Sequence, residues 1–351
     1  MTPPPPTSTP LTTPYHMSSL LEARLPMPIT GMAGPHERAP GAELAGVVLA
    51  MSPGFGLHSA GQLAWLPRYS TQPSATCTIP ASSVSLCMSN AQPAQAWAVL
   101  NTGSLILADA RARDSLPIAA YHHEPAGPAA SVHAAPGSPL VGVGHAGAGG
   151  LTLWDPLRQT PVMQATCDVP LSACVQWCSP QVLLAASGRS LVAWDVRLPK
   201  AQIWPGALLA AEEDSISVLA PCTAQPHCIA IGSTGGRTQL LDTRAAASTH
   251  AVACSHSSAE PVPHRYSVSG LAWAPGSRTT LVSVSMDKTA ALWDWAHATS
   301  PVSKWPASAA DPLSAAAWLP GPAGSSLLLT AGWDSCVRGW APGPADPRVA
   351  T

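Results

Sequence analysis

The residues with the clearest chemical potential form a glycine-rich run in the middle of the chain. Gly142 to Gly147 (GVGHAG) match G-x-G-x-x-G, the pattern whose backbone cradles a pyrophosphate in dinucleotide-binding folds. That chemistry needs a strand before the glycines and a helix after them. Here the run continues through Gly149 and Gly150 into LTLWD, which has the composition of a strand. We therefore interpret the glycines as a hairpin between two strands.

Acid–base or nucleophilic catalysis needs side chains that converge on one point, and the other polar clusters do not predict this. His122 and His123 precede Glu124, but neighbours on a strand point to opposite faces, so a solvated loop is expected. The acidic residues 212–214 predict an exposed connection that could attract a basic peptide. Three serines lie near expected turns, with no histidine and aspartate that the sequence pairs with them: Ser187, Ser233 and Ser285. We expect a binding protein rather than an enzyme.

The cysteines do not predict a metal site. There are nine, without a C-x-x-C pair, and Cys174 and Cys178 lie four apart in a segment that alternates like a strand. Zinc sites usually combine one close pair with a second pair downstream. An odd number of cysteines outside a secretory context indicates reduced, mostly buried thiols. We therefore expect neither metal nor cofactor.

The composition of the 351 residues excludes several other classes. With 39 prolines and 27 glycines spread along the chain, long helices are not expected, and short strands joined by turns are favoured. A net charge of −2 with few basic residues argues against a nucleic-acid partner. The sequence has no run of about 18 apolar residues, so no membrane partner is expected. Its first twenty residues lack the layout of a signal peptide, and the expected compartments are the cytoplasm and nucleus.

The elements that carry these residues follow from an internal repeat. Apolar strands end in Trp-Asp at Trp154, Trp194 and Trp293. Weaker copies complete a series at Trp65, Ala108, Leu241 and Trp340. The seven positions are 40 to 52 residues apart, close to the WD-repeat period of about 40–45 residues, in which four strands form one blade of a β-propeller. The predicted fold is therefore all-β, a seven-bladed WD40 propeller.

The best-preserved repeat predicts a buried polar network. Its strands are expected at 268–273, 281–285 and 290–293, with a tight turn at Asp287. WD-repeat blades often link a histidine, a serine or threonine, the turn aspartate and the tryptophan by hydrogen bonds. The residues that could fill these roles are His264, either Ser283 or Ser285, Asp287 and Trp293. Elsewhere only Asp334 repeats the turn aspartate convincingly.

A propeller closes when a strand from one terminus completes the blade at the other. The chain ends soon after Trp340, so we expect residues 22–30 to supply the missing strand of the last blade. The predicted organisation is a disordered Pro-rich tail over 1–18, the propeller over 19–343 and a second disordered tail over 344–351.

The first blade contains the candidate partner-binding residues. Phe55, the only phenylalanine, lies between two glycines, which leave it nothing rigid to pack into. It either projects into a partner's pocket, as interface hot spots do, or folds over the edge of the blade. His58, Ser59 and Trp65 lie in the same segment and complete the predicted contact set.

Several co-linear segments resemble the WD-repeat subunits of the methylosome. They are TPPPP at the start, EARL before the first blade, WDVRLPK at Trp194–Lys200, LLDTR at Leu240–Arg244, YSVSGLAWAPGS at Tyr266–Ser277 and LLLTAGWDSCVRGW at Leu327–Trp340. The resemblance implies a non-catalytic partner of the type II protein arginine methyltransferase, which makes symmetric dimethylarginine. It also implies a part in presenting histone and Sm protein tails, and hence in snRNP assembly.

The same resemblance implies an aromatic anchor in the first blade, with one departure. The family's anchoring tryptophan precedes Ala-Gly, and here Ser59 precedes Ala60-Gly61. Phe55 or Trp65 would have to take over its role. Two alternatives remain open: a scaffold of another assembly, such as the outer ring of the nuclear pore complex, and an enzyme built on a propeller.

Overall fold

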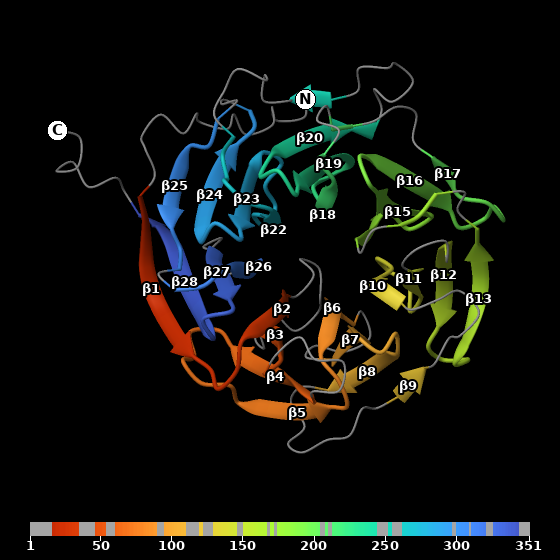
Figure 1. The fold of residues 1–351 in the computed structure, drawn as a ribbon, viewed down its shortest axis with the longest axis horizontal. Helices are drawn as coiled ribbons and strands as arrows, with labels where there is room; N and C mark the ends of the chain where they lie inside the picture. The colour runs from red at the N-terminus through yellow and green to blue at the C-terminus, as the bar shows by residue number, and fades with distance from the viewer. Residues whose placement is uncertain are drawn as a thin grey trace, which may run out of the picture.

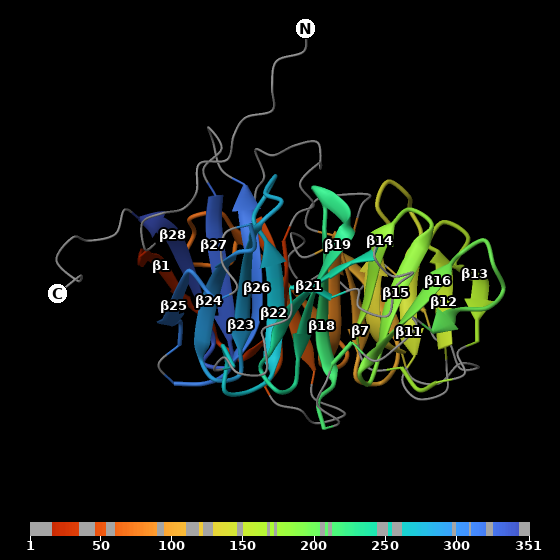
Figure 2. The ribbon, with the colours of Figure 1, turned by 90° about the horizontal axis from the view of Figure 1, so that it is seen from above.

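The structure is a computed structural model in which seven four-stranded antiparallel sheets form a closed ring (Figure 1). It describes residues 16–34, 46–53, 60–89, 95–109, 119–121, 129–145, 150–166, 169–171, 174–203, 208–209, 213–243, 252–254, 262–296, 300–308, 310–320 and 326–343. Viewed from the side in Figure 2, the ring is a disc through which the strands run. The predicted seven-bladed propeller is confirmed.

Four strands make up each blade, in order from the innermost to the outermost. Blade 1 is β2 (Ile29–Ala33), β3 (Gly46–Met51), β4 (Gly61–Pro67) and β5 (Ala75–Ile79), and blade 2 is β6 (Ser83–Met88), β7 (Gln95–Leu100), β8 (Leu105–Asp109) and β9 (Ala119–Tyr121). Blade 3 is β10 (Ala129–Ala134), β11 (Val141–His145), β12 (Gly150–Asp155) and β13 (Thr160–Ala165), and blade 4 is β14 (Val175–Ser179), β15 (Val182–Ser187), β16 (Ser190–Asp195) and β17 (Gln202–Ile203).

The remaining three blades complete the ring. Blade 5 is β18 (Ile216–Cys222), β19 (Gln225–Ser233), β20 (Thr238–Asp242) and β21 (Val252–Cys254), and blade 6 is β22 (Val268–Trp273), β23 (Thr280–Ser285), β24 (Thr289–Asp294) and β25 (Ser303–Pro306). Blade 7 is β26 (Leu313–Pro320), β27 (Ser326–Gly332), β28 (Cys336–Gly343) and β1 (His16–Arg24).

All seven repeat positions predicted from the Trp-Asp series lie on the third strand of a blade. The strands of the best-preserved repeat also agree with β22, β23 and β24 to within a residue. In three blades the aspartate of Trp-Asp closes the turn that follows, because its carboxylate accepts the N–H of the residue two positions on. These carboxylates belong to Asp155, Asp195 and Asp294.

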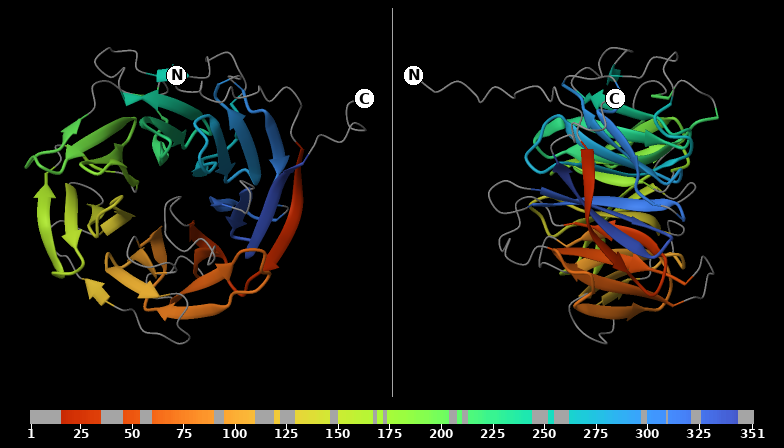
Figure 3. Two further views of the ribbon diagram at one scale, coloured as in Figure 1. Left: turned by 180° about the vertical axis from the view of Figure 1, so that it is seen from behind. Right: turned by 90° about the vertical axis from the view of Figure 1, so that its left-hand side faces the viewer.

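The ring is closed by the N-terminal strand, which overlaps the predicted segment 22–30 only at residues 22–24. β1 pairs with β28 from His16↔Gly343 to Arg24↔Cys336, and Figure 3 shows the red β1 alongside the blue β28. Residues 29 and 30 instead begin the innermost strand of blade 1. Pro26 and Pro28 lie between β1 and β2 and have no N–H to donate to a strand ladder, so the extended segment divides into two strands. β1 also extends into the predicted tail, where Met17 is buried against blades 6 and 7.

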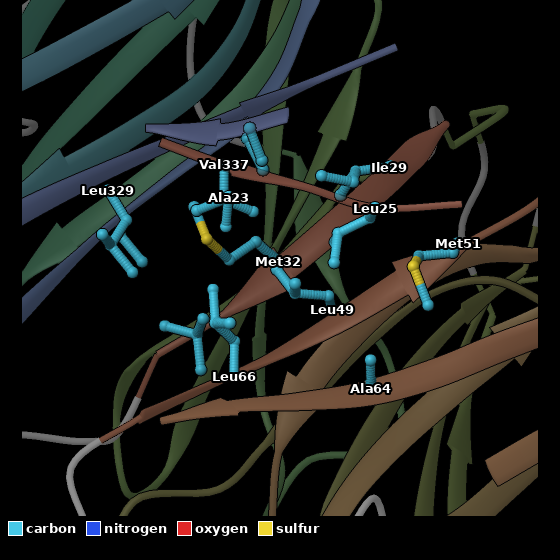
Figure 4. Packing of buried hydrophobic residues seen from close by; sticks show 14 of the residues in the cluster. Ala23, Leu25, Ile29, Met32, Leu49, Met51, Ala64, Leu66, Leu329 and Val337 are labelled. Atoms are coloured by element: carbon cyan, nitrogen blue, oxygen red, sulfur yellow. The ribbon is translucent and has the colours of Figure 1, made fainter. Parts of the chain in front are cut away.

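The apolar core lies between neighbouring blades rather than inside any one of them. The cluster at the closure packs β1 and the strands of blade 7 against blade 1, with Ala23, Leu25 and Val337 facing Ile29 and residues of β3 and β4 (Figure 4). Burial of this surface links the two ends of the chain and stabilises the closed ring.

Polar bonds connect successive innermost strands at equivalent positions. Hydroxyls of one blade donate to a backbone carbonyl of the next at 2.6–2.7 Å, from Ser217 to Val268, from Ser269 to Leu313 and from Ser314 to Ile29. In the other direction, the indole N–H groups of Trp177, Trp273 and Trp318 donate to carbonyls of the preceding blade. These bonds satisfy backbone groups that the ring would otherwise bury unpaired.

Candidate functional site

Blade 6 contains a continuous chain of buried hydrogen bonds. The Trp293 indole Nε1–H donates to Ser283 Oγ at 2.9 Å, and Ser283 Oγ lies 2.8 Å from His264 Nε2. On the other side of the imidazole, His264 Nδ1 lies 2.9 Å from Thr289 Oγ1 and 3.4 Å from Asp287 Oδ1. The His264 side chain is fully buried. We call these five residues the blade 6 network.

The donors and acceptors of the network fit one arrangement of protons. Thr289 Oγ1–H donates to Asp287 Oδ1, so the threonine oxygen accepts from His264 Nδ1–H. His264 Nε2 then accepts from the Ser283 hydroxyl, whose oxygen accepts the indole N–H. Each group donates toward the carboxylate, and such complete satisfaction is what makes a buried network stabilising.

The Asp287 carboxylate is held in its charged form. Burial alone would raise its pKa, but hydrogen bonds from His264, Thr289 and the backbone N–H of Arg265 lower the pKa well below the ordinary value of 3.8. The Arg265 N–H donates to Asp287 Oδ2 at 2.8 Å. The network therefore ends in a carboxylate that also anchors the loop before β22.

The structure decides between the two serines that the sequence left open. Ser283, not Ser285, links His264 to Trp293. The Ser285 hydroxyl donates instead to the carbonyl of Tyr266 at 2.9 Å and accepts the N–H of Asp287. Placing Ser285 in the network is therefore wrong, because its position on β23 directs the hydroxyl to the turn. Thr289, which sequence reasoning missed, follows the turn aspartate by two residues.

Asp334 occupies in blade 7 the position of Asp287, as predicted from its repeat spacing. Its carboxylate accepts from the Ser308 hydroxyl at 3.0 Å and from Arg338 at 2.6 Å. Arg338 also forms an ion pair with Glu22 of β1 at 3.4 Å. The turn aspartate of the last blade is thus connected to the strand that closes the ring.

The loops held by the blade 6 network present exposed side chains of the kinds found at interface hot spots. Tyr266 is 64% exposed and Met286 is 39% exposed. The two loops that carry them are joined by a hydrogen bond from the Met286 N–H to the Ser267 carbonyl. Arg265 is exposed beside them. Tyrosine, methionine and arginine are enriched at protein interfaces. We call Arg265, Tyr266 and Met286 the blade 6 surface.

Most of the partner-binding residues predicted in blade 1 lie outside the described residues, namely Phe55, His58 and Ser59. Trp65 is described, lies on β4, is only 5% exposed and packs in the core between blades 1 and 2. A side chain this buried offers a partner almost no surface, so Trp65 is a core residue rather than a partner contact. The described part of blade 1 instead exposes Tyr69, against which Arg68 stacks at 4.5 Å.

The other clusters considered for chemistry have structural explanations or are not described. β11 and β12 pair as an antiparallel hairpin around the glycine run, as predicted. Ser187 Oγ donates to the Pro170 carbonyl, and Ser233 Oγ accepts the Arg237 N–H within its own turn. Residues 122–124 and 210–212 lie outside the described residues.

Burial raises the pKa of three described thiols, to about 12 for Cys87 and Cys174 and about 11 for Cys178. These thiols stay protonated and unreactive at neutral pH. The described ranges contain no helix long and apolar enough to cross a membrane.

Fold and repeat pattern together define a seven-bladed β-propeller consistent with a WD-repeat protein, a fold that commonly serves as a non-catalytic scaffold. No family model matches the chain, and a search of curated proteins found no match.

Proposed function

We propose that this chain is a non-catalytic scaffold subunit of a methylosome-like complex, with the role of methylosome protein 50. In this role it binds a type II protein arginine methyltransferase and helps to present histone and Sm protein tails, in the cytoplasm and the nucleus. The observation that carries the proposal is the set of resembling segments in their original order, distributed over a closed seven-bladed ring.

Two features support a role in binding proteins. The first is a feature of the sequence, the segment around Phe55, whose flanking glycines predict a projecting aromatic. The second is the blade 6 surface, whose backbone is anchored by the buried carboxylate of Asp287. Side chains held on rigid loops lose little conformational entropy on binding, so they suit a scaffold.

Affinity purification of the tagged full-length chain tests the proposal. Mass spectrometry of the captured proteins should show a symmetric arginine methyltransferase together with histone or Sm proteins. Recovery of nuclear pore scaffold proteins without the methyltransferase would contradict the proposal and favour the alternative assembly. Turnover of a small molecule by the purified chain alone would contradict the non-catalytic role.

Point variants then locate the contact. Phe55→Ala should weaken capture of the methyltransferase by more than about tenfold, as expected for an aromatic hot spot, without lowering Tm. The pair Tyr266→Ala and Met286→Ala tests the blade 6 surface in the same way. Leu157→Ala, at a residue 83% exposed on blade 3, is the matched control and should capture the enzyme normally.

A further inference from the structure

The edge of blade 5 brings together three different metal-binding side chains. A nitrogen of His227, the sulfur of Cys228 and a carboxylate oxygen of Asp242 all lie within 4.8 Å of one another. Cys228 on β19 is directly opposite Asp242 on β20, and Cys228 is buried while the other two are half-buried. In the described part of the chain, it is the one group of three such side chains whose ligand atoms lie this close together.

A local irregularity explains how two consecutive residues reach the same point. Side chains that follow one another on a regular strand point to opposite faces. Here the pairing of β18 with β19 passes from Pro221↔Ile229 directly to Cys222↔Gln225, so that β19 has three additional residues, 226–228, between these pairs. A bulge of this kind changes the direction of side chains, and bulges are common next to functional sites. It brings His227 to the side of Cys228.

The distances leave room for one small ion. The centre of an equilateral triangle with 4.8 Å sides is about 2.8 Å from each corner, so small side-chain rotations reach zinc–ligand distances of about 2.0–2.3 Å. Calcium and magnesium prefer oxygen ligands, whereas a set of nitrogen, sulfur and oxygen donors favours a transition metal or zinc.

We propose that His227, Cys228 and Asp242 bind a single Zn²⁺ ion on blade 5. Binding replaces the Cys228 S–H bond by a Zn–thiolate bond and releases the proton to solvent. Gln225 Oε1 accepts from the Cys228 thiol at 3.4 Å, so this amide oxygen or a water would complete the tetrahedron. The site lies at the end of blade 5 with the β18–β19 turn, on the opposite face of the ring from the blade 6 surface.

Cobalt is the sharpest probe because Co²⁺ bound to a thiolate absorbs light by charge transfer and takes the same tetrahedral site. The full-length chain, stripped with a chelator, should bind one equivalent of Co²⁺ with such a band, and Zn²⁺ should displace the cobalt. Affinity should fall by more than tenfold as the pH is lowered from 8 to 6, because the thiol and the imidazole must lose protons.

Matched variants separate this site from unspecific binding. Cys228→Ser should abolish the band, and Asp242→Asn should weaken binding by more than about tenfold while leaving the band visible at high Co²⁺. Cys178→Ser is the control, because this half-buried thiol lies on blade 4 with its pKa raised to about 11. Circular dichroism of each apo variant checks that the fold persists. A band that survives in Cys228→Ser, or no thiolate band in the wild type, would overturn the proposal.

Discussion

Blades 4 and 6 each carry a Trp-Asp pair on the third strand, yet the indole N–H groups of the two tryptophans have different hydrogen-bond acceptors. In blade 6 the indole N–H of Trp293 donates to Ser283, which leads through His264 to a carboxylate. In blade 4 the indole N–H of Trp194 donates to the carbonyl of Leu198, four residues further along, at 2.8 Å. Both tryptophans are fully buried. The dipeptide thus identifies the strand and its burial, but not the polar partners.

The difference originates in the second strand and its turn. Trp293 is opposite Leu281 and Trp194 is opposite Leu183, so Ser283 and Ala185 occupy equivalent positions. Because Ala185 has no hydroxyl, blade 4 cannot form the hydrogen bond from the indole to the second strand. Its short turn at Gly188 also provides no carboxylate. A blade is therefore stable with either apolar packing or a complete network, and an incomplete network is the costly state.

Removing the centre of the network should have the largest effect. His264→Ala leaves the Ser283 hydroxyl and the Asp287 carboxylate short of partners in a buried site, so we expect a loss of about 3 kcal/mol in the free energy of unfolding. Denaturant titration of wild type and variant measures this difference in the free energy of unfolding. A loss below about 1 kcal/mol would show that blade 6, like blade 4, depends on apolar packing alone.

Neutralising the carboxylate should have a smaller effect that depends on pH. Because the folded-state pKa of Asp287 lies below 3.8, its charged form stabilises the fold above that pH, and the contribution is lost as the pH falls toward the folded-state pKa. Asp287→Asn should cost about 1–3 kcal/mol at pH 7. The gap in stability from wild type should stay constant down to about pH 5 and narrow below about pH 4. A gap that widens on acidification would contradict this assignment.

Exchanging the equivalent residues tests whether one hydroxyl makes a network. Ser283→Ala should cost about 1–2 kcal/mol, because it removes an acceptor from the indole and a donor from His264. The reverse change in blade 4, Ala185→Ser, should also destabilise by about 1–3 kcal/mol, since the new hydroxyl is buried without the rest of the network. Thermal unfolding of both variants checks the pair, and a stabilising Ala185→Ser would contradict the explanation.

The exposed ion pair of blade 4 should have the smallest effect. Side-chain and backbone hydrogen bonds from Arg197 lower the pKa of Asp195 to about 2, but both side chains face solvent. Arg197→Ala should leave Tm unchanged within error at physiological salt, because exposed pairs contribute little there. A clear loss of Tm would show that this pair, and not the buried indole bond, is what replaces the network in blade 4.

The repeat spacing predicted the blades well because each third strand follows from local patterning. The same reasoning predicted His264, Asp287, Trp293 and Asp334 at their positions. Asp287 and Trp293 belong to the β23–β24 hairpin, His264 precedes the first strand of the same blade, and Asp334 repeats the turn aspartate in blade 7. This reasoning placed the closing strand too far along the chain, because the register of β1 depends on pairing with β28, more than 300 residues away. It also did not predict the group around Cys228, because a bulge cannot be read from alternation alone.

The amino-acid sequence by itself determined how many sheets form and which strand of each carries the repeat residue, because these properties follow from short-range periodicity and turn chemistry. Only the tertiary structure decided which hydroxyl completes the blade 6 network, how Arg338 joins Asp334 to Glu22, and which donors meet at the edge of blade 5. Those contacts join residues from different strands or from the two ends of the chain. Their geometry is set by strand register and ring closure, which have no local signature in the sequence.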